Sequence, residues 1–149
     1  MTKTQGALRA LATAVAISAA AFGTTAAAQS APGGTCQIFE HANYQGAAGT
    51  VVGSVGVGDV VMFVDEANAP ADLRGFLENR VGYRVFFDPS WAKMLSSVKV
   101  SNGCTAELHN RLEMFQGSVY PFKKYTSDTS YIGNEENDQA MMAICRCPQ

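Results

Sequence analysis

The sequence predicts an all-β domain built from two related units, and three observations support this prediction. Most of the chain after residue 35 consists of short β-branched and aromatic runs separated by glycine, asparagine or serine, which is the pattern of strands joined by turns. A corner in which Gln-Gly follows an aromatic residue occurs twice, at Tyr44–Gly46 and at Phe115–Gly117. Four cysteines lie at the start of each unit and at the end of the chain.

The first corner follows an alternating strand that begins at Cys36. Phe39 and Tyr44 precede Gly46, so two rings can cover a tight turn whose backbone only glycine adopts without strain. The second unit begins at Cys104 and reaches its corner after a somewhat longer spacing. The two units therefore form an approximate internal repeat.

The chain begins with the features of a signal peptide, which we assign to residues 1–28. Lys3 and Arg9 precede an apolar stretch over residues 10–23, and alanines follow where a signal peptidase needs small residues. A membrane-spanning helix would need about 20 apolar residues, which is more than this stretch provides. We expect a flexible leader over 29–35 and an exported product, periplasmic or secreted, with no membrane insertion after cleavage.

Removal of the signal peptide makes the chain more acidic. The full chain has 11 basic and 13 acidic residues and a net charge of −2, and loss of Lys3 and Arg9 brings the charge to −4. This acidity argues against nucleic acid or an anionic membrane as the partner. The remaining length suits one compact domain over residues 36–147.

The cysteines predict two disulfides. Cys36, Cys104, Cys145 and Cys147 are an even set in an exported chain, and three pairings are possible. Cys145 and Cys147 would lie on the same face of a strand, and a bond between them would close a very small ring. We expect each to reach back to Cys36 or Cys104. A zinc site is the alternative, but the paired Cys-x-x-Cys spacing is absent.

One segment departs from the strand pattern. Pro70 at a helix start, Asp72 in the first turn, and Leu73 and Leu77 at helical spacing predict a short amphipathic helix within residues 65–81. We expect this insertion to cover the core as a lid, and a partner surface is the alternative. Strands are expected around it, at residues 50–52, 60–64, 83–87, 98–100, 120–125 and 143–147.

The repeated corner resembles the Greek-key motif of the βγ-crystallin superfamily. Each motif of that family closes with a calcium-binding signature of the form N/D-N/D-x-x-S/T-S, and residues 91–97 and 137–142 lie where the two signatures should be. The resemblance implies two Greek-key motifs packed as a sandwich, with motif one over residues 36–103 and motif two over residues 104–147. The helical insertion would then belong to motif one.

The resemblance also implies calcium ligands. It assigns that role to Ser96 in the first signature and to Asn137 and Asp138 in the second, and calcium is therefore the one cofactor to consider.

Other ligand positions of the signatures lack oxygen. Ala92 and Lys93 replace the acid or amide pair, and Met141 and Met142 replace the hydroxyls. Because calcium needs six to eight oxygens and a lysine repels a cation, we expect one weak site at most.

The sequence contains no recognisable catalytic constellation. His41 and His109 follow the first strand of each unit, which indicates a repeated structural corner, and neither His-Glu-x-x-His nor Gly-x-Ser-x-Gly occurs. We predict a non-catalytic structural or binding protein with an unidentified protein partner. The alternative is a secreted protease inhibitor whose rigid exposed loop would be residues 126–130 or 65–81.

Overall fold

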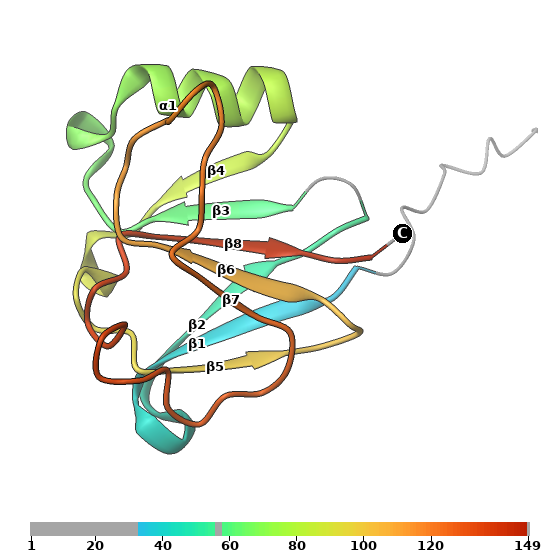
Figure 1. Ribbon diagram of the computed structural model, residues 1–149, viewed down its shortest axis with the longest axis vertical. Coiled ribbons are helices and arrows are strands. Elements are labelled where there is room, and N and C mark those ends of the chain that lie inside the picture. Colours follow the sequence, from blue (N-terminus) through green and yellow to red (C-terminus); the bar gives the residue numbers. More distant parts are fainter. Residues whose placement is uncertain (1–32, 56–57, 149) are drawn as a thin grey trace, which may run out of the picture.

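The structure is a computed structural model that describes residues 33–55 and 58–148. Two β-sheets pack face to face, and a helical segment covers one of them (Figure 1). The expected signal peptide lies outside the described residues, as does most of the expected leader. The strands are β1 (Thr35–His41), β2 (Gln45–Val52), β3 (Asp59–Met62), β4 (Arg84–Phe87), β5 (Ser97–Val100), β6 (Thr105–His109), β7 (Lys123–Tyr125) and β8 (Met142–Arg146). The helical elements are η1 (Ala42–Tyr44), η2 (Glu66–Asn68), α1 (Ala71–Gly75), η3 (Phe76–Val81) and η4 (Pro89–Trp91).

The order of the strands links the two units. One sheet has the order β2-β1-β5 and the other the order β4-β3-β8-β6-β7. In the first unit β1 lies between β2 and β5, and in the second unit β6 lies between β7 and β8. β3 of the first unit crosses to the sheet of the second unit, and Thr129 of the second unit reaches the sheet of the first. Thus β3 pairs antiparallel with β8, and Thr129 of the second unit bridges to Val98 of β5. The predicted all-β sandwich of two Greek-key units is confirmed, and neither sheet is complete without both units.

The first corner has the predicted geometry. The rings of Phe39 and Tyr44 pack edge to face with their centroids 5.6 Å apart, and Gly46 has a φ of 78°. The hydroxyl of Ser97 locks the corner, because it accepts a hydrogen bond from the Tyr44 amide (3.1 Å) and donates one to the carbonyl oxygen of His41 (2.6 Å).

The second corner differs from the first. Gln116 and Gly117 both have positive φ, and the backbones of Phe115 and Ser118 exchange two hydrogen bonds (2.9 and 3.1 Å), so the chain reverses in a two-residue turn. The corner stands away from the sheet, and the Phe115 side chain is 65% exposed. This corner lies further from its strand than the first one does, because β6 ends at His109 and residues 110–114 separate it from Phe115.

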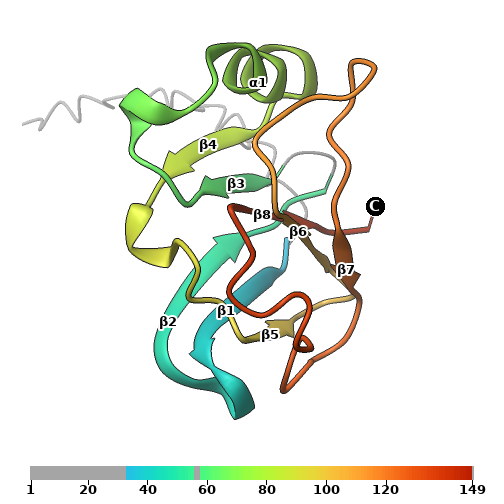
Figure 2. The ribbon, with the colours of Figure 1, turned by 60° about the vertical axis from the view of Figure 1, so that its left-hand side comes forward.

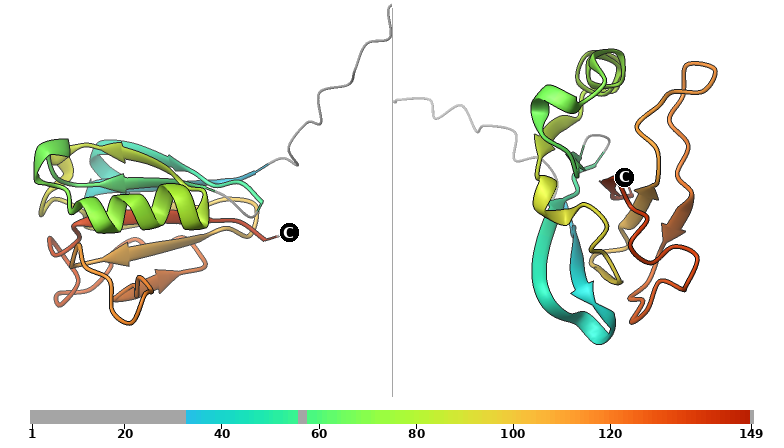
Figure 3. Two further views of the ribbon diagram at one scale, coloured as in Figure 1. Left: turned by 90° about the horizontal axis from the view of Figure 1, so that it is seen from above. Right: turned by 90° about the vertical axis from the view of Figure 1, so that its left-hand side faces the viewer.

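The insertion forms the predicted helix. α1 follows Pro70 and continues without a break into the π-helical turn η3, which ends at Gly82 with a φ of 83°. Leu73 and Leu77 are buried against the face of the five-stranded sheet that points away from the other sheet (Figure 3). The helix is therefore a cover, but it covers the outer face of this sheet and not the core between the sheets.

The helix also makes a parallel pairing that the sequence does not predict. β3 and β4 are parallel neighbours joined through α1, which is a βαβ connection, whereas the other pairings between the labelled strands are antiparallel. The connection adds β4 as an edge strand. Among the described residues, none of the helices is long and apolar enough to cross a membrane.

Two hydrophobic clusters result from this arrangement. The first lies between the sheets and includes Ile38, Val51, Phe63, Trp91, Leu95, Val98 and Leu108. The second lies between the five-stranded sheet and its cover, and includes Val60, Met62, Leu73, Leu77, Tyr83, Met142 and Ile144.

Candidate functional site

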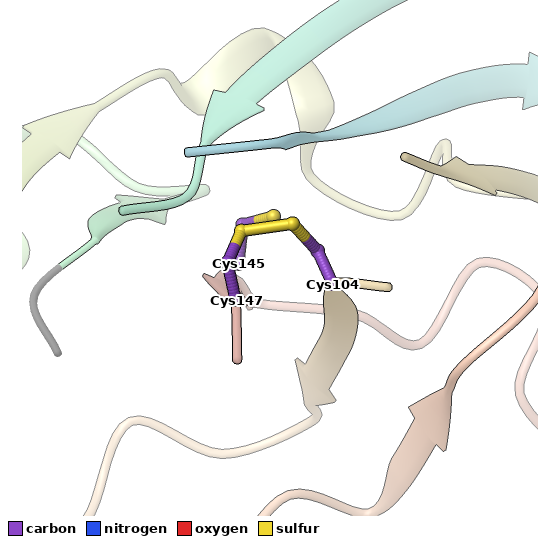
Figure 4. A group of neighbouring side chains, drawn as sticks. All are labelled: Cys104, Cys145 and Cys147. Carbon is purple, nitrogen blue, oxygen red and sulfur yellow. A yellow bond between two sulfur atoms is a disulfide. The ribbon is translucent and has the colours of Figure 1, made fainter. Parts of the chain in front are cut away.

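The disulfides join the end of β8 to the starts of both units. Cys36 bonds to Cys145 and Cys104 bonds to Cys147, which is one of the pairings expected. Cys104, Cys145 and Cys147 lie close enough together to suggest a metal site (Figure 4). All three sulfurs are already in disulfides, however, and thiolates are what a metal would need. The cluster is therefore a pair of disulfides that ties the end of β8 to the starts of both units.

The two signature segments lie side by side. Lys93 and Asp138 occupy the same position in the two signatures and have nearly the same left-handed backbone, with φ of 59° and 58°. The amide of Asp138 donates a hydrogen bond to the carbonyl oxygen of Leu95 (3.3 Å). Lys93, Asp138 and Asn110 help to line one hollow of about 190 Å³. The signatures therefore repeat in backbone conformation as well as in sequence position.

The structure brings together two of the three expected calcium ligands. The side-chain amide of Asn137 donates a hydrogen bond to Oδ2 of Asp138 (2.8 Å), and its own Oδ1 is buried without a hydrogen-bond partner among the described residues. Ser96 is buried, and its backbone is used by hydrogen bonds with Phe39 and Ile132. Neither Ser96 nor Asn137 borders the hollow that contains Asp138.

These residues fit a calcium ion poorly. The free Oδ1 of Asn137 and the carboxylate of Asp138 could contribute oxygens, which is fewer than the six to eight that calcium takes. Lys93 borders the same hollow as Asp138 and opposes a cation there.

Polar side chains are buried on the outer face of the five-stranded sheet. Glu107 of β6 is 3% exposed, and its carboxylate accepts hydrogen bonds from Arg146 Nε (2.7 Å) and Lys124 Nζ (2.9 Å). Burial alone would raise the pKa of Glu107, but the hydrogen bonds and charges of Arg146 and Lys124 outweigh it, so the pKa lies below its usual value. The guanidinium of Arg146 in turn lies over the ring of Tyr83, 5.2 Å from its centroid.

His109 lies two residues beyond Glu107, on the same face of β6. It is 1% exposed, its Nδ1 lies 3.1 Å from the carbonyl oxygen of Tyr120, and its Nε2 is buried without a partner among the described residues. Burial lowers the pKa of His109 to about 4. The ring is therefore neutral at pH 7 and carries its proton on Nδ1, facing the Tyr120 carbonyl.

The two histidines have equivalent positions but different surroundings. His41 and His109 end β1 and β6, as the sequence predicts. The side chain of His41 is largely exposed, whereas that of His109 supports the long loop that follows it. The buried network is not predicted from the sequence, although the alternation of Glu107 and His109 along one strand is a signal for it.

Loop 110–122 is held at its base and open at its tip. Leu112, Met114 and Val119 pack into the outer hydrophobic cluster beside the helix, and the Phe122 amide donates to the Leu108 carbonyl oxygen (2.9 Å). Figure 2 shows the loop extending from the sheet to the level of α1. Phe115 at the tip and Tyr120 nearer the base are 65% and 62% exposed.

The tip of the loop borders a hollow, which we call the aromatic hollow. It has a volume of about 310 Å³ and is lined by Asn110, Arg111, Glu113, Phe115 and Tyr120. The two rings meet edge to face with centroids 6.5 Å apart, and Arg111 Nη1 lies 3.1 Å from Glu113 Oε1. Sequence patterns do not predict this hollow, because it depends on how far the chain runs beyond β6 before it turns at Phe115–Ser118.

Fold and site together define a two-sheet Greek-key domain, closed by two disulfides, that presents an aromatic loop from a rigid body. No protein-family model and no curated protein matches the chain.

Solved structures with a similar course of the backbone include bacterial βγ-crystallin domains. Similarity is found to the domain from Clostridium beijerinckii (20% identity, TM-score 0.43, 74% of this chain and 95% of that chain) and to one from Flavobacterium johnsoniae (15%, 0.44, 74% and 91%). It is also found to the N-terminal domain of Protein S (14%, 0.44, 74% and 93%). The first two bear the name of the superfamily that the sequence resembles. At these identities no binding property of these proteins carries over to this chain.

Proposed function

We propose that this chain is an exported, non-catalytic binding domain in which the sandwich is the scaffold and loop 110–122 is the recognition element. The observation that carries the proposal is the outward display of Phe115 and Tyr120 from a loop in which Leu112, Met114 and Val119 are partly buried against the outer hydrophobic cluster. Each exposed aromatic ring leaves apolar surface in contact with water. Burial of such surface is favourable by roughly 25 cal/mol per Å². A partner that covers both rings recovers that free energy.

The way the loop is held supports recognition by a preformed surface. The turn at Phe115–Ser118 is closed by two backbone hydrogen bonds, and the base is fixed by Phe122 and by the contact of His109 with Tyr120. A loop that is ordered before binding loses less conformational entropy when a ligand arrives.

Export is supported by the two disulfides, because such bonds persist in oxidising compartments. It also agrees with the signal peptide expected over residues 1–28. The absence of catalysis is supported by the state of Glu107 and His109. The carboxylate of Glu107 is occupied by Arg146 and Lys124, and His109 is covered by the loop.

A weak calcium site at the second signature is a secondary proposal. The specific support is the buried Oδ1 of Asn137, which has no hydrogen-bond partner among the described residues, next to the carboxylate of Asp138. Lys93 limits its affinity.

The protease-inhibitor alternative rests on the two expected segments, residues 126–130 and 65–81. Within residues 126–130, Thr129 exchanges backbone hydrogen bonds with Val98 (3.0 and 2.8 Å), and the helix of segment 65–81 is packed through Leu73 and Leu77. Incubation with a panel of secreted serine, cysteine and metalloproteases would test inhibition. Unchanged proteolysis at excess protein would remove this alternative.

The recognition proposal is tested by screening the mature protein against a glycan array and a phage-displayed peptide library. The double variant Phe115→Ala/Tyr120→Ala should lose at least tenfold in affinity for a ligand found in either screen. Phe86→Ala is the matched control, since Phe86 is an exposed ring (48%) on β4, an element outside the loop. Ligands that bind the wild type and the double variant equally would contradict the proposal.

A further inference from the structure

The aromatic hollow has a composition that selects among ligand classes, and this inference rests on the recognition role proposed for the loop. Its two charged residues, Arg111 and Glu113, are paired with each other at 3.1 Å. The hollow therefore has no net charge from its lining residues. An anionic or a cationic ligand would have to compete with this internal pair, whereas a neutral ligand would not.

The aromatic pair offers flat surfaces. Phe115 and Tyr120 meet edge to face, with an interplanar angle of 64°, so the rings do not stack on each other's faces, and both residues are largely exposed. The face of an aromatic ring is electronegative. It attracts the polarised C–H groups that line one side of a pyranose ring, so a sugar ring can stack there.

The remaining lining groups match hydroxyl groups. A guanidinium supplies donors in one plane, a carboxylate supplies acceptors, and the side-chain amide of Asn110 supplies both. Paired donors and acceptors of this kind bind vicinal hydroxyl groups, each of which both donates and accepts. A volume of about 310 Å³ lies at the small end of ligand pockets.

A protein partner fits the same hollow less well. The cores of protein interfaces are depleted of charged residues, but here an ion pair lies inside the hollow beside the rings. Covering it with an apolar side chain would desolvate both charges without replacing their hydration. The hydroxyl groups of a sugar can replace the hydration of these two charges.

From this geometry we propose that the aromatic hollow binds a neutral oligosaccharide, with a sugar ring stacked on Tyr120 or Phe115 and hydroxyl groups held by Arg111, Glu113 and Asn110. The ligand is a neutral oligosaccharide that is recognised through its hydroxyl groups and through the C–H groups on one side of a sugar ring.

The test is a titration of isotope-labelled mature protein, followed by amide chemical shifts. The probes are cellotetraose, maltotetraose and chitotetraose as neutral oligosaccharides, tetragalacturonate as an anionic one, and the peptides selected on phage. Wild type is compared with Tyr120→Ala, Phe115→Ala and Glu113→Gln, and Phe86→Ala is the control. The spectrum of each free variant shows whether it is folded, which is expected because all the altered side chains are exposed.

The expected result is saturable binding of at least one neutral oligosaccharide, with shifts confined to residues 110–120. Affinity for the oligosaccharide should fall at least tenfold in whichever of Tyr120→Ala and Phe115→Ala binds it less tightly. It should stay within twofold of wild type in Phe86→Ala. It should also stay within twofold between low salt and 0.5 M salt, because no ion pair with the ligand is made or lost.

Other outcomes overturn the inference in distinguishable ways. Binding of tetragalacturonate alone, or strong weakening by salt, would contradict a neutral ligand. Peptides that depend on Phe115 and Tyr120, with no oligosaccharide bound, would remove the glycan and leave the recognition role of the loop intact. If neither an oligosaccharide nor a peptide bound at the loop, both the glycan proposal and the recognition role of the loop would be contradicted.

Discussion

His109 Nδ1 lies 3.1 Å from the carbonyl oxygen of Tyr120, and this contact joins the buried end of β6 to the base of loop 110–122. The neutral ring donates its Nδ1–H to this carbonyl, so a second proton would have to go to Nε2, which is buried without a partner among the described residues. Glu107 faces the ring from its own strand, and Arg146 and Lys124 from the neighbouring strands add positive charge.

The first prediction is that the protein loses stability at acidic pH because His109 is buried. The pKa of His109 is about 4 in the folded protein against 6.5 for an unperturbed histidine, so between these values the unfolded chain binds more protons than the folded one. This contribution to stability is complete above pH 6.5 and is lost as the pH falls toward 4, by at most about 3 kcal/mol. Urea unfolding of wild type and His109→Gln at pH 7.0, 5.5 and 4.5 measures it.

His41→Gln is the control for this experiment, because His41 has the equivalent position but is exposed. We expect the free energy of unfolding to depend less on pH in His109→Gln than in wild type or His41→Gln. The same pH dependence in all three proteins would contradict the assignment.

The second prediction compares two ion pairs. Glu107→Ala should lower the free energy of unfolding by about 2 kcal/mol at pH 7, because a buried carboxylate with two cationic partners is lost. Arg146 and Lys124 are half-exposed and can be rehydrated, which limits the cost. Glu113→Ala removes an exposed pair with Arg111 and should cost less than about 0.5 kcal/mol. Equal costs for the two variants would show that Glu107 is not buried as described.

The third prediction concerns the disulfides. Peptide mapping without reduction should recover Cys36 joined to Cys145 and Cys104 joined to Cys147. Replacing either pair by serine should cost about 4 kcal/mol in the chain-entropy model, since the two bonds close loops of 109 and 43 residues. Recovery of Cys36 joined to Cys147 would exclude the observed path of β8.

The fourth prediction concerns calcium. Millimolar calcium should raise the melting temperature only slightly over chelator, and Asp138→Ala should abolish the rise, because a ligand of the folded state stabilises in proportion to its saturation. Lys93→Asn should enlarge the rise, since it removes a positive charge from the hollow that Asp138 borders and adds an amide oxygen. A rise that survives in Asp138→Ala would place the ion elsewhere.

Local patterns in the sequence predicted much of the fold. The corner at Phe39, Tyr44 and Gly46, the helix after Pro70, and the reach of Cys145 and Cys147 back to the unit starts all depend on spacing along the chain. Each of these features follows from a rule about which residues share a face or adopt a turn.

What the sequence did not predict depends on contacts between distant segments. The parallel pairing of β4 with β3 needs the helix between them to fold back over the sheet. The burial of His109 needs the loop to fold over it, and the aromatic hollow exists because β6 ends well before the turn at Gln116.

The role of loop 110–122 as the recognition element is decided by the binding of the double variant Phe115→Ala/Tyr120→Ala. The dissociation constant of this variant should be measured beside those of wild type and Phe86→Ala, for each ligand that the screens recover. We expect at least a tenfold loss of affinity in the double variant and none in Phe86→Ala. Unchanged affinity in the double variant for every ligand would contradict it.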